Sequence, residues 1–301
     1  MFPFRNILFP TDFSPHSHAA LKYAAAFARH GRGRVVLFSV HDGKGVANFQ
    51  SQAEEVVSNP LLKGVDVERI LAEGEPTSEI AQAAIDHEID LITVAMRDRN
   101  RLYRAFGNSM AEAIVAESPC AVLAVRPPQR DFVEQQDGQV EIRLKRVLLA
   151  TNFRPSSSAA TQLATQIANQ LGAELHAVYV IGDYFEHLSA MFPEGGLAAL
   201  TRLRSYVQER MAQLLRTGAG ASTHIEEGRP YQEIVKLAAT LDADLIVIGK
   251  AVHGSLFGSS QVLGSEIERV IRNAPCPVLC VPAARVVTPL PALVTQVVPQ
   301  T

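Results

Sequence analysis

The sequence predicts an α/β protein of two consecutive domains, each with a five-stranded parallel sheet and helices on both faces. Two observations support this fold class. Short apolar runs rich in β-branched residues alternate with helical segments along the chain, as in parallel sheets that are covered on both faces. The same series of motifs also occurs twice, and 301 residues are enough for two ordinary domains.

The second half of the chain repeats the first half. Seven residues of the opening segment, among them Thr11, Phe13 and Pro15, return unchanged 140 residues later, and later motifs return at shifts of 154 and then 156 residues. The matching segments are 5–15 with 145–155, 73–76 with 227–230, 90–92 with 244–246 and 109–125 with 265–281. Matches in one order, with two changes of shift, indicate a tandem duplication.

The first copy alternates between the two kinds of element. Apolar, β-branched runs predict strands near residues 4–9, 34–41, 65–72, 90–96 and 120–125. Helices are expected near 16–30, 50–58, 76–87 and 109–117. In the first of these helices, Ala19, Tyr23 and Phe27 follow one another at i, i+4 spacing and form an apolar face.

The second copy follows the same order. Strands are expected near 145–150, 173–181, 221–226, 244–249 and 277–282, and helices near 156–171, 197–217, 230–241 and 265–273. In the long helix, Leu203, Val207 and Met211 form a stripe that we interpret as a surface facing the core. The domains are predicted at 1–128 and 143–285, with a polar, proline-containing linker between them and a C-terminal tail at 286–301.

Composition excludes several classes of protein. A content of 47% hydrophobic and 20% charged residues is typical of a globular protein with a sizeable core. The net charge of −3 gives no reason to expect nucleic acid, and no apolar run reaches the roughly 18 residues of a membrane span. The beginning lacks a signal-peptide pattern, and three cysteines fit neither a disulfide framework nor a zinc site. We therefore expect a cytoplasmic protein.

A glycine-rich segment, 249–265, follows a buried strand and precedes a helix. Such a loop can hold phosphate, because its backbone N–H groups point at the anion and the helix N-terminus adds about half a positive charge. Lys250 and His253 could donate to the same phosphate. A second interpretation needs no ligand, since Ser265 and Glu268 have the spacing of a capping box that closes the helix. Spacing alone leaves both interpretations open.

The ordered motifs resemble the universal stress protein family. They are Pro10-Thr11-Asp12-Phe13-Ser14, Gly228-Arg229-Pro230, the pair Gly254 and Gly264-Ser265, and Ala274-Pro275-Cys276-Pro277-Val278-Leu279. The resemblance covers both copies and implies a Rossmann-like fold, often paired through the last strand. It also implies ATP binding in members that keep the glycine pattern, and its absence in members that lack it.

The resemblance places a nucleotide site in the second copy. Ala251 replaces the first glycine of the family loop, an alternative register uses Gly249 instead, and Asn152 stands where the family has an adenine-contacting Asp. An amide can both donate and accept on an adenine edge, so that change is tolerable. Arg154 could reach a phosphate or be solvated. The residues assigned to the nucleotide are Asn152, Val180, Gly249, Ala251, Gly254, Gly264, Ser265 and Glu266.

The equivalent loop of the first copy is degenerate. Asp12 is intact, but Asp98 and Asn108 replace the glycines at the positions of Gly254 and Gly264. A carboxylate about 5 Å from a phosphate costs about 3 kcal/mol per phosphate charge at an effective dielectric near 20. Four arginines in this loop could form an anion site of their own, although a solvated loop explains them as well. His16, His18 and His41 are interpreted as solvent-facing rather than as a metal or acid–base cluster.

We expect a tandem universal stress protein that binds one ATP in its second copy, with or without magnesium, and takes part in a stress response. Alternatives are a ligand-free interaction protein and a slow ATPase or phosphotransferase; no catalytic residue or metal ligand is assigned, so an enzyme is not the preferred interpretation. Because exposed apolar edges aggregate, the two final strands, near 121–125 and 278–281, should pair within the chain as a pseudo-dimer. A further homo-oligomer is left open.

Overall fold

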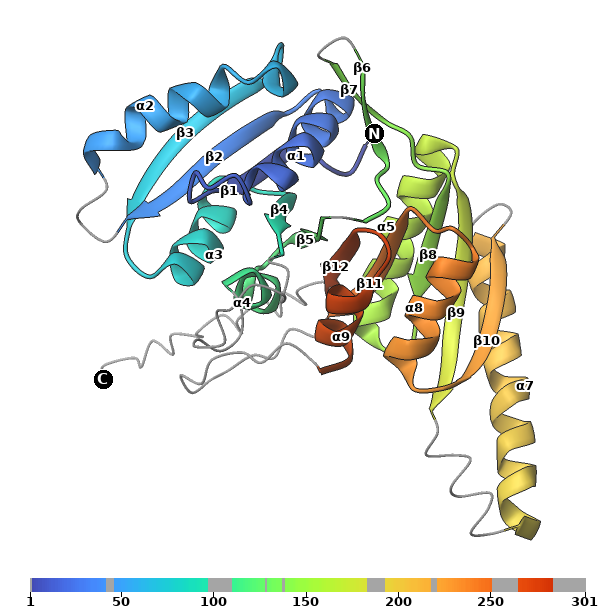
Figure 1. Cartoon of the computed structure of the whole chain (residues 1–301). Coiled ribbons are helices and arrows are strands. Elements are labelled where there is room, and N and C mark those ends of the chain that lie inside the picture. Colours follow the sequence, from blue (N-terminus) through green and yellow to red (C-terminus); the bar gives the residue numbers. More distant parts are fainter. Residues whose placement is uncertain are drawn as a thin grey trace, which may run out of the picture.

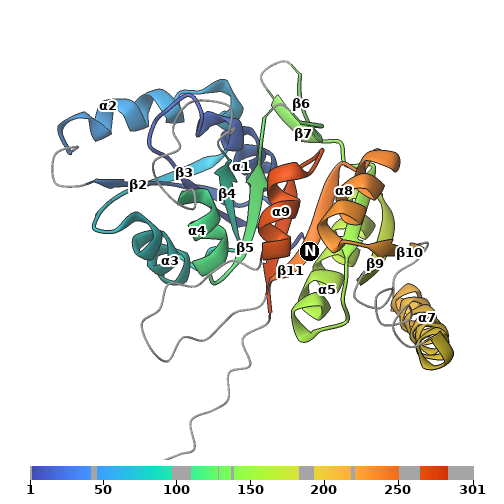
Figure 2. The same cartoon turned by 60° about the horizontal axis from the view of Figure 1, so that its bottom comes forward.

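The structure, a computed structural model, describes residues 2–41, 46–96, 110–127, 129–136, 139–182, 193–217, 221–250 and 265–283. Within these ranges the chain forms one ten-stranded sheet and one two-stranded sheet. Helices cover both faces of the larger sheet (Figure 1, Figure 2). None of the described helices is long and apolar enough to span a membrane.

The first half contains five parallel strands in the order β3-β2-β1-β4-β5. Its strands are β1 (Asn6–Pro10), β2 (Arg34–His41), β3 (Asp66–Glu73), β4 (Leu91–Ala95) and β5 (Ala121–Val125). Its helices are α1 (His18–Gly31), α2 (Val46–Val57), α3 (Pro76–Asp86) and α4 (Met110–Glu117), with a short 3-10 turn at Pro60–Leu62. Each predicted element of this half is present within a few residues of its expected position.

The second half has the same arrangement, with strand order β10-β9-β8-β11-β12. Its strands are β8 (Arg146–Ala150), β9 (Glu174–Gly182), β10 (Ser222–Gly228), β11 (Leu245–Lys250) and β12 (Val278–Pro282). Its helices are α5 (Pro155–Leu171), α7 (Pro193–Thr217), α8 (Pro230–Thr240) and α9 (Ser265–Asn273). The predicted fold class, two tandem Rossmann-like domains, is therefore confirmed.

The two halves share one sheet because their last strands pair with each other. β12 runs antiparallel to β5, with Val278 opposite Ala124 and Leu279 opposite Leu123. This pairing confirms the predicted intrachain pseudo-dimer. It also buries the apolar edge of each five-stranded sheet, which would otherwise be open to another chain.

Each strand sends alternate side chains into two different cores, as strand geometry requires. In β1, Ile7 and Phe9 enter a core covered by α1, α2, α5 and α7, whereas Leu8 enters a core covered by α3, α4, α8 and α9. Both cores extend through the two halves, so the central seam is continuous with the interior on either face of the sheet.

The described residues between the halves, 129–136 and 139–142, form regular structure where composition had predicted a polar linker. It forms a hairpin of β6 (Val133–Gln136) and β7 (Gln139–Ile142). The Phe132 ring is fully buried against Tyr23 of α1, whose hydroxyl donates to Asp131. In β7, Val140 and Ile142 alternate with Gln139 and Glu141, so the average polarity conceals one buried face.

Candidate functional site

The carboxyl edge of the second half has the topology of a ligand site. β8 lies between β9 and β11, with Ala150 opposite both Val178 and Ile248. The chain leaves β8 towards β9 on one side and reaches β11 on the other by a later crossover. Ligands of open α/β sheets bind in the crevice at such a reversal of strand order.

Three of the residues assigned to the nucleotide come together at this edge. Asn152 follows β8 by two residues, Val180 lies in the last part of β9, and Gly249 is the penultimate residue of β11. Val180 is half-buried against the core, and Asn152 is exposed. Ala251, Gly254 and Gly264 lie outside the described residues, as does the side chain of Ser265.

The Asn152 side chain is fixed by hydrogen bonds to its amide oxygen. Oδ1 accepts from the backbone N–H of Arg154 at 3.1 Å and from the Ser157 hydroxyl at 2.7 Å. The backbone N–H can only donate, so the atom facing it must be the oxygen. Among the described residues the side-chain amide nitrogen has no partner, and it is therefore available to a ligand with an acceptor.

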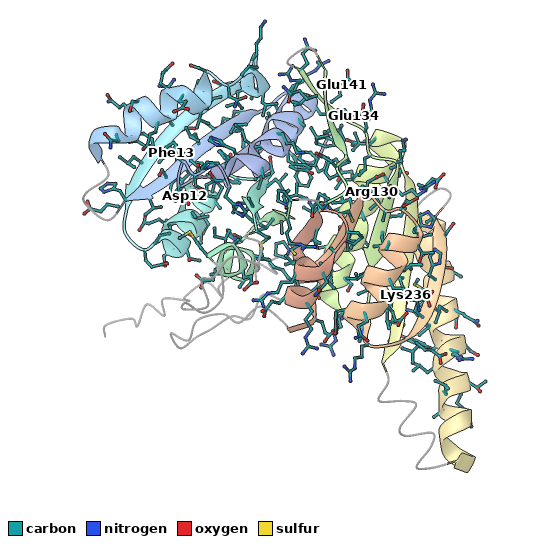
Figure 3. The ribbon with its side chains drawn as sticks, viewed as in Figure 1. Asp12, Phe13, Arg130, Glu134, Glu141 and Lys236 are labelled. Atoms are coloured by element: carbon teal, nitrogen blue, oxygen red, sulfur yellow. The ribbon has the colours of Figure 1, made fainter. Side chains whose placement is uncertain are left out.

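The first half repeats this turn with a carboxylate. Asp12 accepts from the Ser14 backbone N–H at 3.0 Å and from the Ser14 hydroxyl. Asp12 and Phe13 lie together at the end of β1 (Figure 3). His16 is partly buried, and its Nε2 lies 3.0 Å from the carbonyl oxygen of Met96, so it faces solvent only in part.

Both turns contain a phenylalanine in the left-handed region. Phe13 has φ 59° and Phe153 has φ 58°, a conformation that costs a non-glycine residue about 1–2 kcal/mol. Stacking compensates in the second half, where the Phe153 ring lies 5.0 Å from that of Tyr179 and the Arg210 guanidinium lies 5.6 Å above it. Strained residues at matching positions are typical of functional turns.

Gly249 is explained by packing of α5. A β-carbon at this residue would lie 2.3 Å from the carbonyl oxygen of Ser156, in the first turn of α5. The helix therefore approaches the end of β11 so closely that any larger residue displaces it. This role does not depend on a bound nucleotide.

We expect Gly249→Ala to lower the free energy of unfolding by about 1–3 kcal/mol, because overpacking forces backbone shifts. Thermal and denaturant unfolding of the full chain would measure the loss. Gly182→Ala is the matched control, since a β-carbon at Gly182 meets nothing within 4 Å. Equal stability of the two variants would contradict the packing role of Gly249.

Lys250 does not point towards the predicted phosphate position, which corrects the expectation that it donates there. Its side chain is 2% exposed, and Nζ donates to the carbonyl oxygens of Val115 and Ser118 in the first half. Burial lowers the pKa of Lys250 to about 8. The three acceptors within 3.5 Å of Nζ, which include Ala116, match the three donors of an ammonium group.

Glu266 joins the beginnings of two helices. Its carboxylate accepts from the backbone N–H of Tyr231, in the first turn of α8, at 3.0 Å, and lies 3.4 Å from the Arg269 guanidinium. Glu268 pairs with Arg272 at 2.6 Å. The carboxylates at the start of α9 are thus engaged by protein donors.

An open pocket of about 640 Å³ lies beside the Asn152 turn, between α5 and α7. Arg154 and Arg210 line it together with polar residues of α5 that include Thr161, Thr165 and Gln166. We did not predict this pocket. A signal existed in the duplication, because Thr161 and Thr165 replace Leu21 and Ala25, which are buried in the first half.

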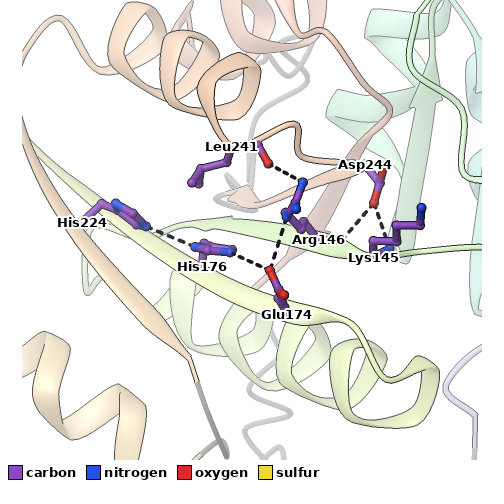
Figure 4. A network of polar contacts seen from close by, with 7 residues as sticks. All are labelled: Lys145, Arg146, Glu174, His176, His224, Leu241 and Asp244. Atoms are coloured by element: carbon purple, nitrogen blue, oxygen red, sulfur yellow. Dashed lines mark hydrogen bonds and ion pairs between the residues drawn. The ribbon is translucent and has the colours of Figure 1, made fainter.

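A polar network at the opposite, amino edge of the sheet stabilises the start of a strand (Figure 4). Asp244 Oδ2 accepts from the backbone N–H groups of Lys145 and Arg146 at 2.8 and 2.9 Å. Asp90 makes the same pair of bonds to Arg5 and Asn6 in the first half. The repeated Asp-Leu-Ile motif is therefore explained by capping of the first strand of each half.

The same network contains a histidine pair. His176 Nδ1 lies 3.2 Å from His224 Nε2, and His176 Nε2 lies 3.6 Å from Glu174 Oε2 (Figure 4). The first half has Val36 and Ile70 at the equivalent positions. No three His, Cys, Asp or Glu side chains gather as a metal site among the described residues.

Burial lowers the pKa of His224, and His176 lowers it further, whereas Glu226 raises it. The unfolded chain therefore takes up the proton first as the pH falls, so the folded state loses stability below about pH 6.5. We expect His224→Ile, which copies the first half, to reduce the drop in melting temperature between pH 7.5 and pH 5. Thr223→Ile on the same strand should leave that drop unchanged, and an unchanged drop in His224→Ile would contradict the assignment.

Comparison with known proteins agrees with this architecture. A profile of the universal stress protein family matches residues 3–126 and again residues 143–282. A universal stress protein of Methanocaldococcus jannaschii is 33% identical over 147 residues, which are 46% of this chain and 81% of the relative. One from Thermus aquaticus is 35% identical over 136 residues, 41% of this chain and 99% of the relative.

One of the solved structures shows the same fold over nearly the whole chain. The alignment with a universal stress protein of Archaeoglobus fulgidus covers 94% of this chain and 100% of the other chain, with a TM-score of 0.65 and 23% identity. Another solved structure, 19% identical and covering 41% of this chain with a TM-score of 0.36, is a universal stress protein in complex with cAMP. With the family profile matched in both halves, the chain belongs to the universal stress protein family.

Proposed function

We propose that this chain binds one adenine nucleotide, ATP with magnesium, in its second half as part of a stress response. The observation that carries the proposal is the Asn152 turn at the reversal of strand order. It presents an amide nitrogen that has no partner among the residues that the structure describes, next to the end of β11 from which the glycine-rich segment 251–264 begins.

The adenine and the phosphates would meet different parts of this edge. The Asn152 amide suits an acceptor on the adenine ring, as amide side chains do on adenine edges. Gly254, Gly258 and Gly264 allow backbone N–H groups to approach phosphate oxygens, and the N-terminus of α9 adds its partial positive charge. Magnesium would be held chiefly by the phosphate oxygens, as is usual for this ion.

The first half is a poorer nucleotide site. Asp12 keeps its position, but the loop carries Asp98 where the second half has Gly254. Micromolar binding corresponds to about 8 kcal/mol, so a penalty of about 3 kcal/mol from one carboxylate leaves little affinity. We therefore propose one nucleotide per chain, bound by the second half.

Native mass spectrometry and calorimetry of the full chain with ATP and magnesium test this proposal. We expect one ATP per chain and at least about tenfold weaker binding in Asn152→Leu, the change that a lost hydrogen bond of about 1.4 kcal/mol produces. Asp12→Leu breaks the same turn in the first half and should leave the affinity unchanged. Two equivalent ATP molecules, no ATP, or sensitivity to Asp12 alone would contradict the proposal.

A further inference from the structure

Helix α4 of the first half is held at both ends by cations of the second half. At its C-terminal end, Lys250 Nζ donates to the carbonyl oxygens of Val115 and Ser118, the latter at 2.7 Å. At its N-terminal end, Arg272 of α9 binds Glu112 through two contacts, Nε to Oε1 at 2.6 Å and Nη2 to Oε2 at 2.8 Å.

These contacts are buried and matched to the helix ends. Lys250 is 2% exposed and Glu112 is 3% exposed. The last carbonyl groups of a helix have no partner within it, and a cation there also interacts favourably with the helix dipole. A two-contact pair between an arginine and a carboxylate fixes orientation as well as distance. The position of α4 relative to the second half is therefore closely defined.

The attachment of each helix to the other half is only partly reciprocal. The residues of the first half equivalent to Lys250 and Arg272 are Met96 and Ala116, which carry no charge. The first half instead reaches α9 with Arg126, whose Nη2 donates to the carbonyl oxygen of Ala274, just past the C-terminal end of that helix, at 3.0 Å. The C-terminal ends of both helices thus receive a cation from the other half, whereas the ion pair of Arg272 with Glu112 has no counterpart from Ala116.

The two cations flank the glycine-rich segment. Lys250 is the last residue of β11, directly before residue 251, and α9 begins at Ser265, directly after residue 264. Both elements from which this segment starts and ends are thus attached to the same helix of the other half. A displacement of α4 would move both attachment points.

We propose that α4 of the first half positions the nucleotide loop of the second half, with Lys250, Arg272 and Glu112 as positioning residues; this inference rests on the proposed function. Nucleotide bound at the loop then stabilises α4, because the two are coupled through these contacts. The first half, whose own loop carries Asp98, supplies the support on which the second site depends.

The first test is the ATP affinity of Glu112→Gln, measured by calorimetry with magnesium. The variant keeps the side-chain size and removes the charge that binds Arg272. We expect at least fivefold weaker binding with one site per chain retained. Glu68→Gln is the control, because it breaks an arginine–carboxylate pair in the same half, with Arg34 at 2.6 Å, far along the chain from the loop. Its affinity should equal that of the wild type.

The second test needs no variant. Hydrogen exchange of the wild-type chain should slow in the peptide covering residues 110–117 when ATP and magnesium are added, while the peptide of α1 stays unchanged. A merely structural role of Glu112 would lower the melting temperature of Glu112→Gln and leave both the affinity and this exchange response unaltered. That result would overturn the inference.

The outcomes separate the two proposals. A wild-type chain that binds no ATP overturns the proposed function and this inference together. Binding with unchanged affinity in Glu112→Gln and no slowing in 110–117 overturns the inference alone. If Glu112→Gln does not fold, the inference is judged on the wild type alone: slower exchange in residues 110–117 with ATP and magnesium supports it, and unchanged exchange overturns it.

Discussion

Lys250→Met is expected to lower the free energy of unfolding by about 3 kcal/mol or more. Methionine copies the residue of the first half and keeps the volume, but it removes the donor that satisfies buried carbonyl oxygens of α4. Each buried acceptor left without a partner costs about 1–3 kcal/mol. Urea denaturation would measure the change, and the melting temperature should fall by several degrees.

Lys236→Met is the control for this substitution. Lys236 lies on α8 with its side chain 72% exposed and pairs with Glu233 at 3.0 Å (Figure 3). Exposed pairs contribute little to stability, so this variant should unfold close to the wild type. Similar losses in both variants would show that the cross-half contacts of Lys250 contribute no more than a surface ion pair.

Gly264→Val is expected to abolish measurable ATP binding while the fold persists. Gly264 directly precedes α9, where a β-branched side chain would block the approach of the backbone to phosphate and crowd the start of the helix. Loss of the phosphate contacts should weaken binding at least a hundredfold. Calorimetry and circular dichroism of the same sample would report affinity and fold.

Asn108→Val provides the matched control, because Asn108 occupies the equivalent position of the first half. It introduces the same side chain before the equivalent helix and should leave the ATP affinity unchanged. Wild-type affinity in Gly264→Val would refute the assignment of phosphate to this loop. Loss of binding in Asn108→Val alone would place the nucleotide in the first half.

The fold could be predicted in detail because the two halves of the chain repeat one series of motifs and can be compared with each other. The strands and helices within the matched segments were supported twice, by their periodicity and by their repeat. The pairing of β5 with β12 followed from the resemblance to a family that pairs through its last strand, together with the need to cover two apolar edges. The carboxyl edge followed from the strand order expected of such sheets, whereas Asn152, Val180 and Gly249 were assigned to it from the family resemblance.

The direction of individual side chains could not be predicted. Lys250 at the end of a buried strand beside glycines suggested a phosphate donor, and nothing in its spacing showed that the side chain crosses to α4. The hairpin between the halves was missed for a different reason. Phe132 and Val140 are buried there against residues far along the chain, and local composition does not report such contacts.

The antiparallel seam between β5 and β12 makes assembly of the two halves independent of dilution. A tethered partner is present at an effective concentration in the millimolar range, so pairing does not need a second chain. In a dimer of identical subunits every substitution enters both sites at once. Within one chain a substitution enters one half alone, and a lysine can therefore be fixed at residue 250 while methionine remains at residue 96.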